Sequence, residues 1–147
     1  MPPLTVVVVD DTLDYRQIVR ALLADLPDLV TIVGEAADGP EGLTVVLRER
    51  PDIVITDLMM PHLNGVELAR RIRQELPQTK IILMSSYTED AYRLMASDSG
   101  ADAFVNKRVM FDALLPAIRD LIARRLSGGS GPLPPTMGGS SASAVLQ

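Results

Sequence analysis

The sequence places three carboxylates where they can meet. Asp10 and Asp11 follow the apolar run Val6 to Val9, and Asp57 follows the run Ile53 to Ile55 after one intervening threonine. Consecutive β-branched residues without polar alternation are typical of a strand buried on both faces of a parallel sheet. The carboxyl ends of such strands meet at one edge, where open α/β sheets bind ligands. Crowded carboxylates raise one another's pKa unless a cation intervenes, and an all-oxygen site favours Mg²⁺ or Mn²⁺.

A hydroxyl group and an ammonium group add to this set. Ser85 ends the apolar run Ile81 to Met84, and Lys107 follows the run Ala103 to Val105 by one residue. A lysine ammonium pairs with a carboxylate or a phosphoryl oxygen. A metal, a carboxylate nucleophile, a hydroxyl donor and a cation are the parts that phosphoryl transfer requires. The sequence therefore predicts that Asp57 accepts a phosphoryl group.

Each of these residues also has a purely structural interpretation. The two adjacent aspartates would suit a loop that caps the first helix, and Asp57 would suit a solvated strand end. Lys107 would be an ordinary surface lysine, and Ser85 a turn residue. These explanations compete residue by residue, but together they do not account for five such side chains at one edge of a sheet.

The elements that position these residues follow a regular alternation. Five short apolar runs recur about 25 residues apart: Leu4 to Val9, Val30 to Val33, Ile53 to Ile55, Ile81 to Met84, and Ala103 to Val105. Helical apolar stripes lie between and after them, within residues 15–26, 43–47, 66–76, 91–95 and 114–122. Alternating strands and helices predict an α/β fold, a (βα)5 doubly wound five-stranded parallel sheet. The expected strand order is 2-1-3-4-5, as in flavodoxin-like folds.

Local signals predict where several helices begin and end. Asn64 suits the cap of the third helix, followed by Gly65. Gly100 suits the left-handed residue after the fourth helix. Pro116 fits poorly inside the fifth helix, because an internal proline costs about 3 kcal/mol. We therefore expect that helix to start late, with Asp112 as its cap, or to be bent.

Bulk composition limits the class of protein. The chain has 147 residues, a formal net charge of -5 and no cysteine. These values predict one domain without disulfides, no binding of nucleic acid through this chain and no attraction to an anionic membrane. No apolar run approaches the roughly 20 residues that span a bilayer, and no signal peptide is recognisable. We expect a cytoplasmic location.

The last 21 residues differ from the rest in composition. Residues 127–147 hold half of the ten glycines, three prolines and no charged residue. Such a segment cannot build a core and reads as a linker or tail. Its final residues, Ala144 to Gln147, resemble a sequence that coronavirus main proteases cut, so part of the tail is either an expression remnant or native sequence. We predict a domain over residues 1–126 and a Gly/Pro/Ser-rich tail over residues 127–147.

Four motifs together resemble the response-regulator receiver domain, the phosphoacceptor module of two-component signalling, known as the CheY-like fold. The resemblance covers roughly residues 4–126. It rests on Val8-Val9-Asp10-Asp11, on Asp57-Leu58-Met59-Met60-Pro61-His62-Leu63-Asn64-Gly65, on Met84-Ser85-Ser86, and on the stretch from Gly100 to Lys107. The absence of a proline after the lysine is similar to receivers found in helix-turn-helix regulators.

The resemblance implies a role for each site residue. Asp57 would take a phosphoryl group from the phosphohistidine of a sensor histidine kinase or a histidine phosphotransfer protein. Asp11 would bind Mg²⁺ directly, Asp10 would bind it through water, and Met59 would offer its backbone carbonyl. Lys107 would bind the phosphoryl group. Such a chain catalyses its own phosphorylation and slow dephosphorylation, and it is not a turnover enzyme.

The resemblance also implies a switch. Ser85 would hydrogen-bond the phosphoryl group and shift towards it, and Phe104 would swing inward as Ser85 moves. This motion would change the surface formed by the fourth strand, the fourth helix and the fifth strand, and homodimerisation on phosphorylation is one expected consequence. The alternative for Phe104 is an ordinary core aromatic.

The sequence departs from the commonest receiver pattern at several positions. Arg108 replaces the usual proline after Lys107, and Phe104 stands where tyrosine is frequent. Met59 and Tyr87 flank the expected phosphoryl site, and their bulk would slow hydrolysis of the aspartyl phosphate. His62 is the single histidine, and we interpret it as a solvated loop residue.

Two other functions compete with the phosphoacceptor. A receiver fold used only for docking, independently of phosphorylation, usually lacks one of the acidic pair, the aspartate or the lysine, all of which are present here. A phosphohydrolase with an aspartate nucleophile would carry a second aspartate two residues later, where this chain has Met59. The signalling kinase, the output and the presence of a following domain stay open.

Overall fold

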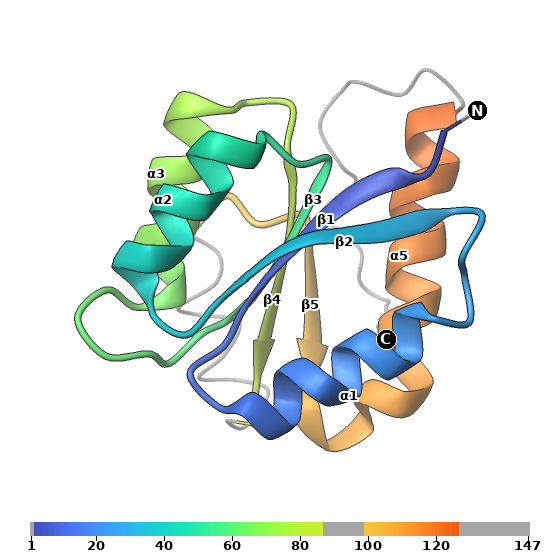
Figure 1. Cartoon of the computed structure of the whole chain (residues 1–147), viewed down its shortest axis with the longest axis horizontal. Helices are drawn as coiled ribbons and strands as arrows, with labels where there is room; N and C mark the ends of the chain where they lie inside the picture. The colour runs from blue at the N-terminus through green and yellow to red at the C-terminus, as the bar shows by residue number, and fades with distance from the viewer. Residues whose placement is uncertain (1, 87–98, 127–147) are drawn as a thin grey trace.

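The computed structural model describes residues 2–86 and 99–126 (Figure 1). The predicted fourth helix and Tyr87 lie outside the described residues, and so does the tail after residue 126. The expectations for these segments, including the division into domain and tail, stay predictions.

The sheet has the predicted topology. Its strands are β1 (Leu4–Val9), β2 (Val30–Ala36), β3 (Ile53–Asp57), β4 (Lys80–Ser85) and β5 (Ala103–Asn106), and they lie in the order β2-β1-β3-β4-β5. All four pairings are parallel. β1 and β3 are therefore neighbours although β2 separates them along the chain, and their carboxyl ends lie side by side at the switch point of the fold.

Four described helices cover the two faces of this sheet. They are α1 (Leu13–Leu23), α2 (Gly39–Glu49), α3 (Gly65–Glu75) and α5 (Met110–Leu126). Figure 1 shows α2 and α3 on one face and α1 and α5 on the other. β1 serves both layers, because Val6 and Val8 belong to the core under α1 and α5, whereas Val7 and Val9 belong to the core under α2 and α3. Burial on both faces explains the unbroken apolar run.

β2 continues three residues past its predicted end at Val33. The extension includes a charged residue, Glu35, whose charge is neutralised by arginines. Glu35 is half-buried and pairs with Arg16 at 3.3 Å and with Arg20, both on α1. The pairing of β1 with β2 also shifts register between Val6 and Val7. A charged residue thus stays in the strand because a helix supplies its counter-charges, which the hydropathy pattern does not reveal.

Two predicted helix signals are confirmed. The Asn64 side chain accepts a hydrogen bond from the Glu67 N–H at 2.9 Å, so it caps α3 as expected. Gly100 has the expected left-handed conformation, with a φ of 78°, and the helix that it was predicted to end lies outside the described residues. Asn64 sets the start of α3, and Gly100 precedes β5, so both signals act on segments that lead to the site.

The predicted late start of the fifth helix at Asp112 is wrong. A short 3₁₀ turn, η1 (Lys107–Val109), leads directly into α5 at Met110, and the Asn106 side chain accepts a backbone N–H of that turn at 2.8 Å. Pro116 consequently lies inside the helix. Met110 is only 1% exposed, and burying such a side chain contributes roughly 2 kcal/mol, which offsets much of the proline's cost.

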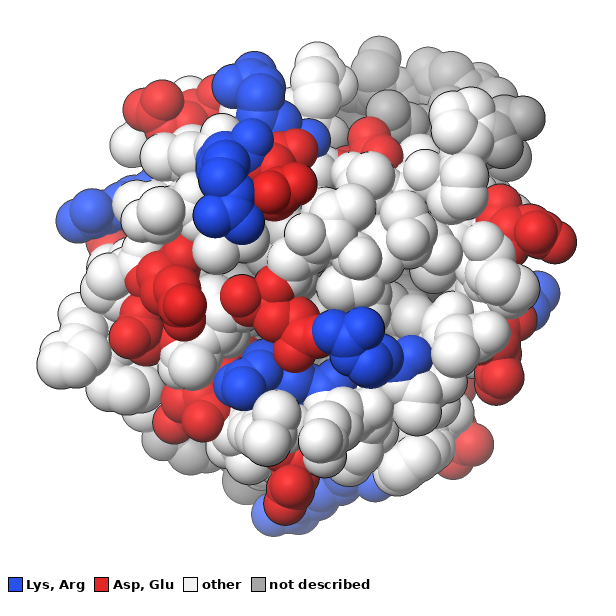
Figure 2. Space-filling view, in the orientation of Figure 1, with Lys and Arg blue, Asp and Glu red and all other residues white. Residues whose placement is uncertain are grey.

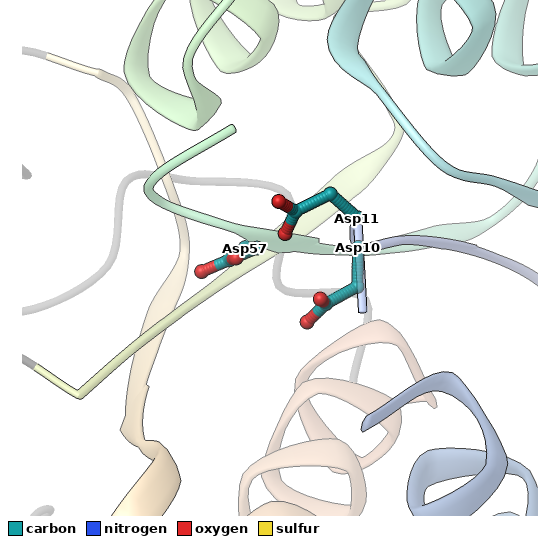
Figure 3. A group of neighbouring side chains, drawn as sticks. All are labelled: Asp10, Asp11 and Asp57. Carbon is teal, nitrogen blue, oxygen red and sulfur yellow. The ribbon is translucent and has the colours of Figure 1, made fainter. Parts of the chain in front are cut away.

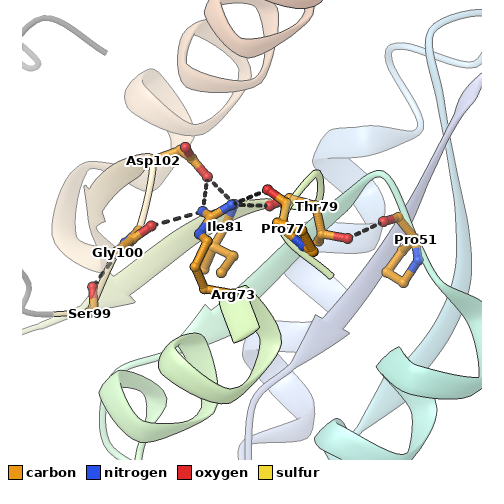
Figure 4. Close-up of polar contacts among 9 residues, drawn as sticks. Pro51, Arg73, Pro77, Thr79, Ile81, Ser99, Gly100 and Asp102 are labelled. Carbon is orange, nitrogen blue, oxygen red and sulfur yellow. Dashed lines mark hydrogen bonds and ion pairs between the residues drawn. The ribbon is translucent and has the colours of Figure 1, made fainter. Parts of the chain in front are cut away.

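Arg73, near the end of α3, closes the edge of the sheet opposite the aspartates (Figure 4). Its guanidinium donates to the carbonyls of Thr79 and Gly100 at 2.9 and 2.8 Å and pairs with the Asp102 carboxylate at 2.7 Å. The same Asp102 oxygen accepts the Ile81 N–H at 2.8 Å. One side chain therefore ties α3 to the starts of β4 and β5.

No helix in the described part of the chain combines the length and the apolar character that crossing a bilayer would demand.

Candidate functional site

The three aspartates predicted to meet do so at the carboxyl edge of the sheet (Figure 3). One carboxylate oxygen from each of Asp10, Asp11 and Asp57 lies within 4.8 Å of the others. Asp10 directly follows β1, and Asp57 is the last residue of β3. Asp10 and Asp57 are buried, whereas Asp11 is exposed. The adjacency of β1 and β3 therefore creates an acidic site with one open side.

Lys107 reaches this site from β5's end. Its Nζ lies 2.8 Å from Asp10 Oδ2 and 3.3 Å from Asp57 Oδ2, and its side chain is 6% exposed. The interpretation of Lys107 as an ordinary surface lysine is therefore wrong. A buried ammonium between two carboxylates neutralises part of their charge and can pair with phosphoryl oxygens.

The pKa of Asp57 is raised from 3.8 to about 6. Burial is the main cause, and the neighbouring charge of Asp10 acts in the same direction. Lys107 and the N–H of Met59 lower the pKa, but they do not cancel these two effects. One ammonium thus leaves the ionised carboxylates under-compensated, as expected for a site that takes a further cation.

The residues present fit a hard divalent cation. All three side chains in the cluster offer carboxylate oxygens, the ligands that Mg²⁺ and Mn²⁺ prefer. Asp10 Oδ2 is buried and accepts no aligned hydrogen bond, and its contact with Lys107 is an ion pair. The site therefore retains unused acceptor capacity, and Asp11 supplies an exposed oxygen through which a hydrated ion can approach.

Backbone contacts hold the Asp57 end of β3. The Leu58 N–H donates to the Met84 carbonyl at 2.8 Å, and the Gly65 N–H donates to the Leu58 carbonyl at 2.8 Å. A Cβ on Gly65 would lie 2.2 Å from the Asp57 carbonyl oxygen, so only glycine permits this approach. The start of α3 and the Asp57 backbone are therefore packed directly together.

The loop between β3 and α3 contains a tight turn. The Leu63 N–H donates to the Pro61 carbonyl at 2.8 Å, which places His62 at the centre of a three-residue turn with a φ of 71°. This conformation is uncommon for a residue with a side chain. His62 is exposed, in agreement with its interpretation as a loop residue. Met59, in the same loop, is 47% exposed beside Asp57.

Ser85 and Phe104 occupy different environments. Ser85 is 2% exposed at the end of β4, in register with Asn106, which precedes Lys107. It therefore ends β4 at the same sheet edge as the carboxylates. Phe104 on β5 is 36% exposed, so its interpretation as a core aromatic is wrong.

Three residues that sequence reasoning did not assign to the site also contact it. The Thr12 N–H donates to Asp10 Oδ1 at 2.9 Å, and an Arg16 N–H donates to the Asp10 carbonyl. The Tyr15 ring centroid lies 3.9 Å from Lys107 Nζ. The sequence pattern places Tyr15 only in the apolar helix stripe within residues 15–26. The signal was its place in the first turn of α1, which begins two residues after Asp11.

Charged side chains of both signs are interspersed over the face drawn in Figure 2, and among the described residues visible there no single basic patch dominates.

Comparison with known proteins gives a consistent result. A family model described as "Response regulator receiver domain" matches residues 6–119. The chain is 32% identical over 114 residues to the response regulator protein VraR of Staphylococcus epidermidis, covering 78% of this chain and 54% of the relative. It is 30% identical over 114 residues to the transcriptional regulatory protein DegU of Brevibacillus brevis, covering 78% and 48%. The chain thus spans about half the length of the curated relatives it matches.

Solved structures agree with these relatives. The signal receiver domain of the putative response regulator NarL from Mycobacterium tuberculosis aligns with a TM-score of 0.76 at 32% identity. The alignment covers 84% of this chain and 98% of that domain. The described fold is therefore that of a receiver domain.

Proposed function

The chain belongs to the family of response regulator receiver domains, and on that premise we propose that it is a Mg²⁺-dependent phosphoacceptor that is phosphorylated on Asp57. The observation that carries the proposal is the buried contact of Lys107 with both Asp10 and Asp57, at 2.8 and 3.3 Å. A lysine at that place counters the charge of a nucleophilic carboxylate and of the group that it receives. This buried contact also distinguishes the site from an ordinary cluster of solvated acidic residues.

Asp10, Asp11 and Asp57 would hold the Mg²⁺ ion, together with the backbone carbonyl of Met59. When bound, the ion neutralises charge on the transferred phosphoryl group. An Asp57 oxygen attacks phosphorus, the O–P bond forms, and the P–N bond to the donor histidine breaks. The imidazole leaves with the electron pair of the P–N bond and takes a proton from solvent water. Lys107 pairs with the phosphoryl oxygens.

The raised pKa of Asp57 is compatible with this chemistry. With a pKa of about 6, the carboxylate is mostly ionised at neutral pH even before a metal ion is present. A more basic carboxylate is also a better nucleophile than one with an ordinary pKa. Burial thus favours reaction without preventing ionisation.

We propose that phosphorylation also switches the surface around β4 and β5. Ser85 would turn its hydroxyl towards the phosphoryl group, and Phe104, which is 36% exposed, would move inward. The fourth helix, expected around the apolar stripe within residues 91–95, would belong to the same surface, and it lies outside the described residues. A bistable segment that responds to one dianion is sufficient for such a switch.

The proposed partners follow from this role. Receiver domains take phosphate from histidine kinases, so we propose a sensor histidine kinase or a histidine phosphotransfer protein as the donor, and homodimerisation as one response. Self-catalysed phosphorylation without turnover, and a cytoplasmic location, belong to the same proposal. The prediction that this chain binds no nucleic acid is not supported by its relatives, since one is named a transcriptional regulatory protein.

Intact mass after treatment with acetyl phosphate and Mg²⁺ tests the proposal. We expect the wild-type chain to gain one phosphoryl group, Asp57→Asn to gain none, and chelation of Mg²⁺ to abolish the gain. Asp14→Asn is the matched control, because this exposed aspartate lies in the first turn of α1 and should be labelled like the wild type. Equal labelling of Asp57→Asn would exclude Asp57 as the acceptor. A complete lack of labelling would favour phosphorylation-independent docking.

A further inference from the structure

Lys107 has an aromatic neighbour that the proposed chemistry does not use. Its Nζ lies 3.9 Å from the centroid of the Tyr15 ring, in addition to its ion pairs with Asp10 and Asp57 at 2.8 and 3.3 Å. Tyr15 belongs to the first turn of α1, whose helix packs on the core shared with α5. The ammonium therefore lies between two carboxylates and one ring face, on a side chain that is only 6% exposed.

The ring face is a suitable neighbour for this ammonium. The π-system presents partial negative charge on its face and attracts a cation within about 6 Å of the centroid, most strongly where water is excluded. A carboxylate in place of Tyr15 would attract Lys107 more strongly. It would also add negative charge where an anionic phosphoryl group must enter. An aromatic face holds the cation without adding a net charge.

We propose that Tyr15 is a positioning residue that holds the Lys107 ammonium between Asp10 and Asp57 through the face of its ring. The inference rests on the proposed phosphoacceptor function, in which Lys107 meets the phosphoryl oxygens. Lysine has a long flexible stem, and without the ring its ammonium spends less time at the site. The rate of phosphorylation should therefore depend on the electron density of the ring at position 15.

The main alternative is that Tyr15 only fills space. It is half-buried against the core, and an aliphatic side chain would pack there as well. Ring fluorination distinguishes the two roles, because it removes electron density from the ring face with little change in volume. A packing role predicts no trend across such a series, whereas a cation–π role predicts a steady decline.

The experiment measures the rate constant for phosphorylation by acetyl phosphate with Mg²⁺, first for the wild type and Asp57→Asn. Labelling that depends on Asp57 must be present before the series at position 15 is interpreted, so failure of the proposed function is recognised separately. The series is Tyr15→Phe, the same position with di- and trifluorophenylalanine, and Tyr15→Leu. Thermal unfolding of each variant shows that the chain is folded.

We expect Tyr15→Phe to react within about twofold of the wild type, the fluorinated rings to react progressively more slowly, and Tyr15→Leu to be slower by about 10-fold. Phe111→Leu on α5 is the control for loss of an aromatic side chain, since Phe111 is 66% exposed, and its rate should not change. Equal rates for phenylalanine, its fluorinated forms and leucine would overturn the proposal. Loss of activity in Tyr15→Phe would also overturn it, because the hydroxyl group would then be the functional part.

Discussion

Lys107 Nζ and Asp57 Oδ2 lie 3.3 Å apart, although the strand β4 separates the ends of β5 and β3 from which these residues come. The contact lowers the pKa of Asp57, but burial and the charge of Asp10 outweigh it and leave the pKa at about 6. Ionised Asp57 therefore destabilises the metal-free folded chain. This unfavourable interaction persists until a bound cation or a covalent phosphoryl group changes the charge at the site.

Replacing Asp57 with Asn should stabilise the metal-free protein at pH 8 by about 1 kcal/mol. Because the folded-state pKa is raised from 3.8 to about 6, protonated Asp57 favours the folded state below pH 4, and this stability is lost as the pH rises through 6. The advantage of Asp57→Asn should therefore shrink at pH 5. Urea unfolding of both proteins at pH 5 and pH 8 measures this advantage. If Asp57→Asn is no more stable than the wild type at pH 8, the repulsion between Asp57 and Asp10 is contradicted.

Mg²⁺ should raise the melting temperature of the wild-type chain, because an ion that binds only the folded state stabilises it. At a concentration about ten times the dissociation constant the gain is about 1.4 kcal/mol. Asp11→Asn should lose most of this gain, since Asp11 offers the exposed oxygen of the cluster. Asp14→Asn should keep it. Calorimetry with Mg²⁺ and with EDTA decides, and an equal response in both variants would remove Asp11 from the metal site.

Gly65→Ala should destabilise the fold by about 2 kcal/mol and disturb phosphorylation. The new Cβ would lie 2.2 Å from the Asp57 carbonyl oxygen and 2.9 Å from the Leu58 Cα, and backbone atoms cannot rotate away. Gly34→Ala is the comparison, because its Cβ would meet a side-chain methyl of Val45 at 2.7 Å, which can move. Chemical unfolding of both variants should show the larger loss for Gly65→Ala, and the reverse order would be inconsistent with this packing.

Arg73→Ala should cost about 2 kcal/mol, because the Gly100 carbonyl and part of the Asp102 carboxylate would lose their partner. Arg73→Lys should not restore the loss, since a single ammonium cannot reproduce the planar fork that serves several acceptors. Arg71→Ala is the matched control: its ion pair with Glu67 is exposed and contributes about 0.5 kcal/mol or less. If Arg71→Ala and Arg73→Ala lose equal stability in thermal unfolding, the proposed role of the Arg73 contacts is contradicted.

Much of the fold could be predicted because its strands and helix ends are encoded in short stretches of adjacent residues. The strand runs, the cap at Asn64 and the left-handed Gly100 are each visible in a few adjacent residues. The errors arose where a distant partner changed the outcome. β2 retains Glu35 because arginines on α1 neutralise it, and α5 begins earlier than predicted because its first residue, Met110, packs in the core shared with β1 and α1. In both cases the stabilising contacts come from elements that are distant in sequence.

By itself, the amino-acid sequence determined the parallel sheet and the five polar residues at the strand ends, because hydropathy and residue type are local properties. General rules for connecting parallel strands then gave the strand order. Only the tertiary structure decided how those residues meet. The burial that raises the pKa of Asp57, the sharing of Lys107 between Asp10 and Asp57, and the Tyr15 ring beside its ammonium all depend on contacts between separate elements. Such contacts are set by packing in three dimensions, and the order of residues along the chain does not fix their distances or their burial.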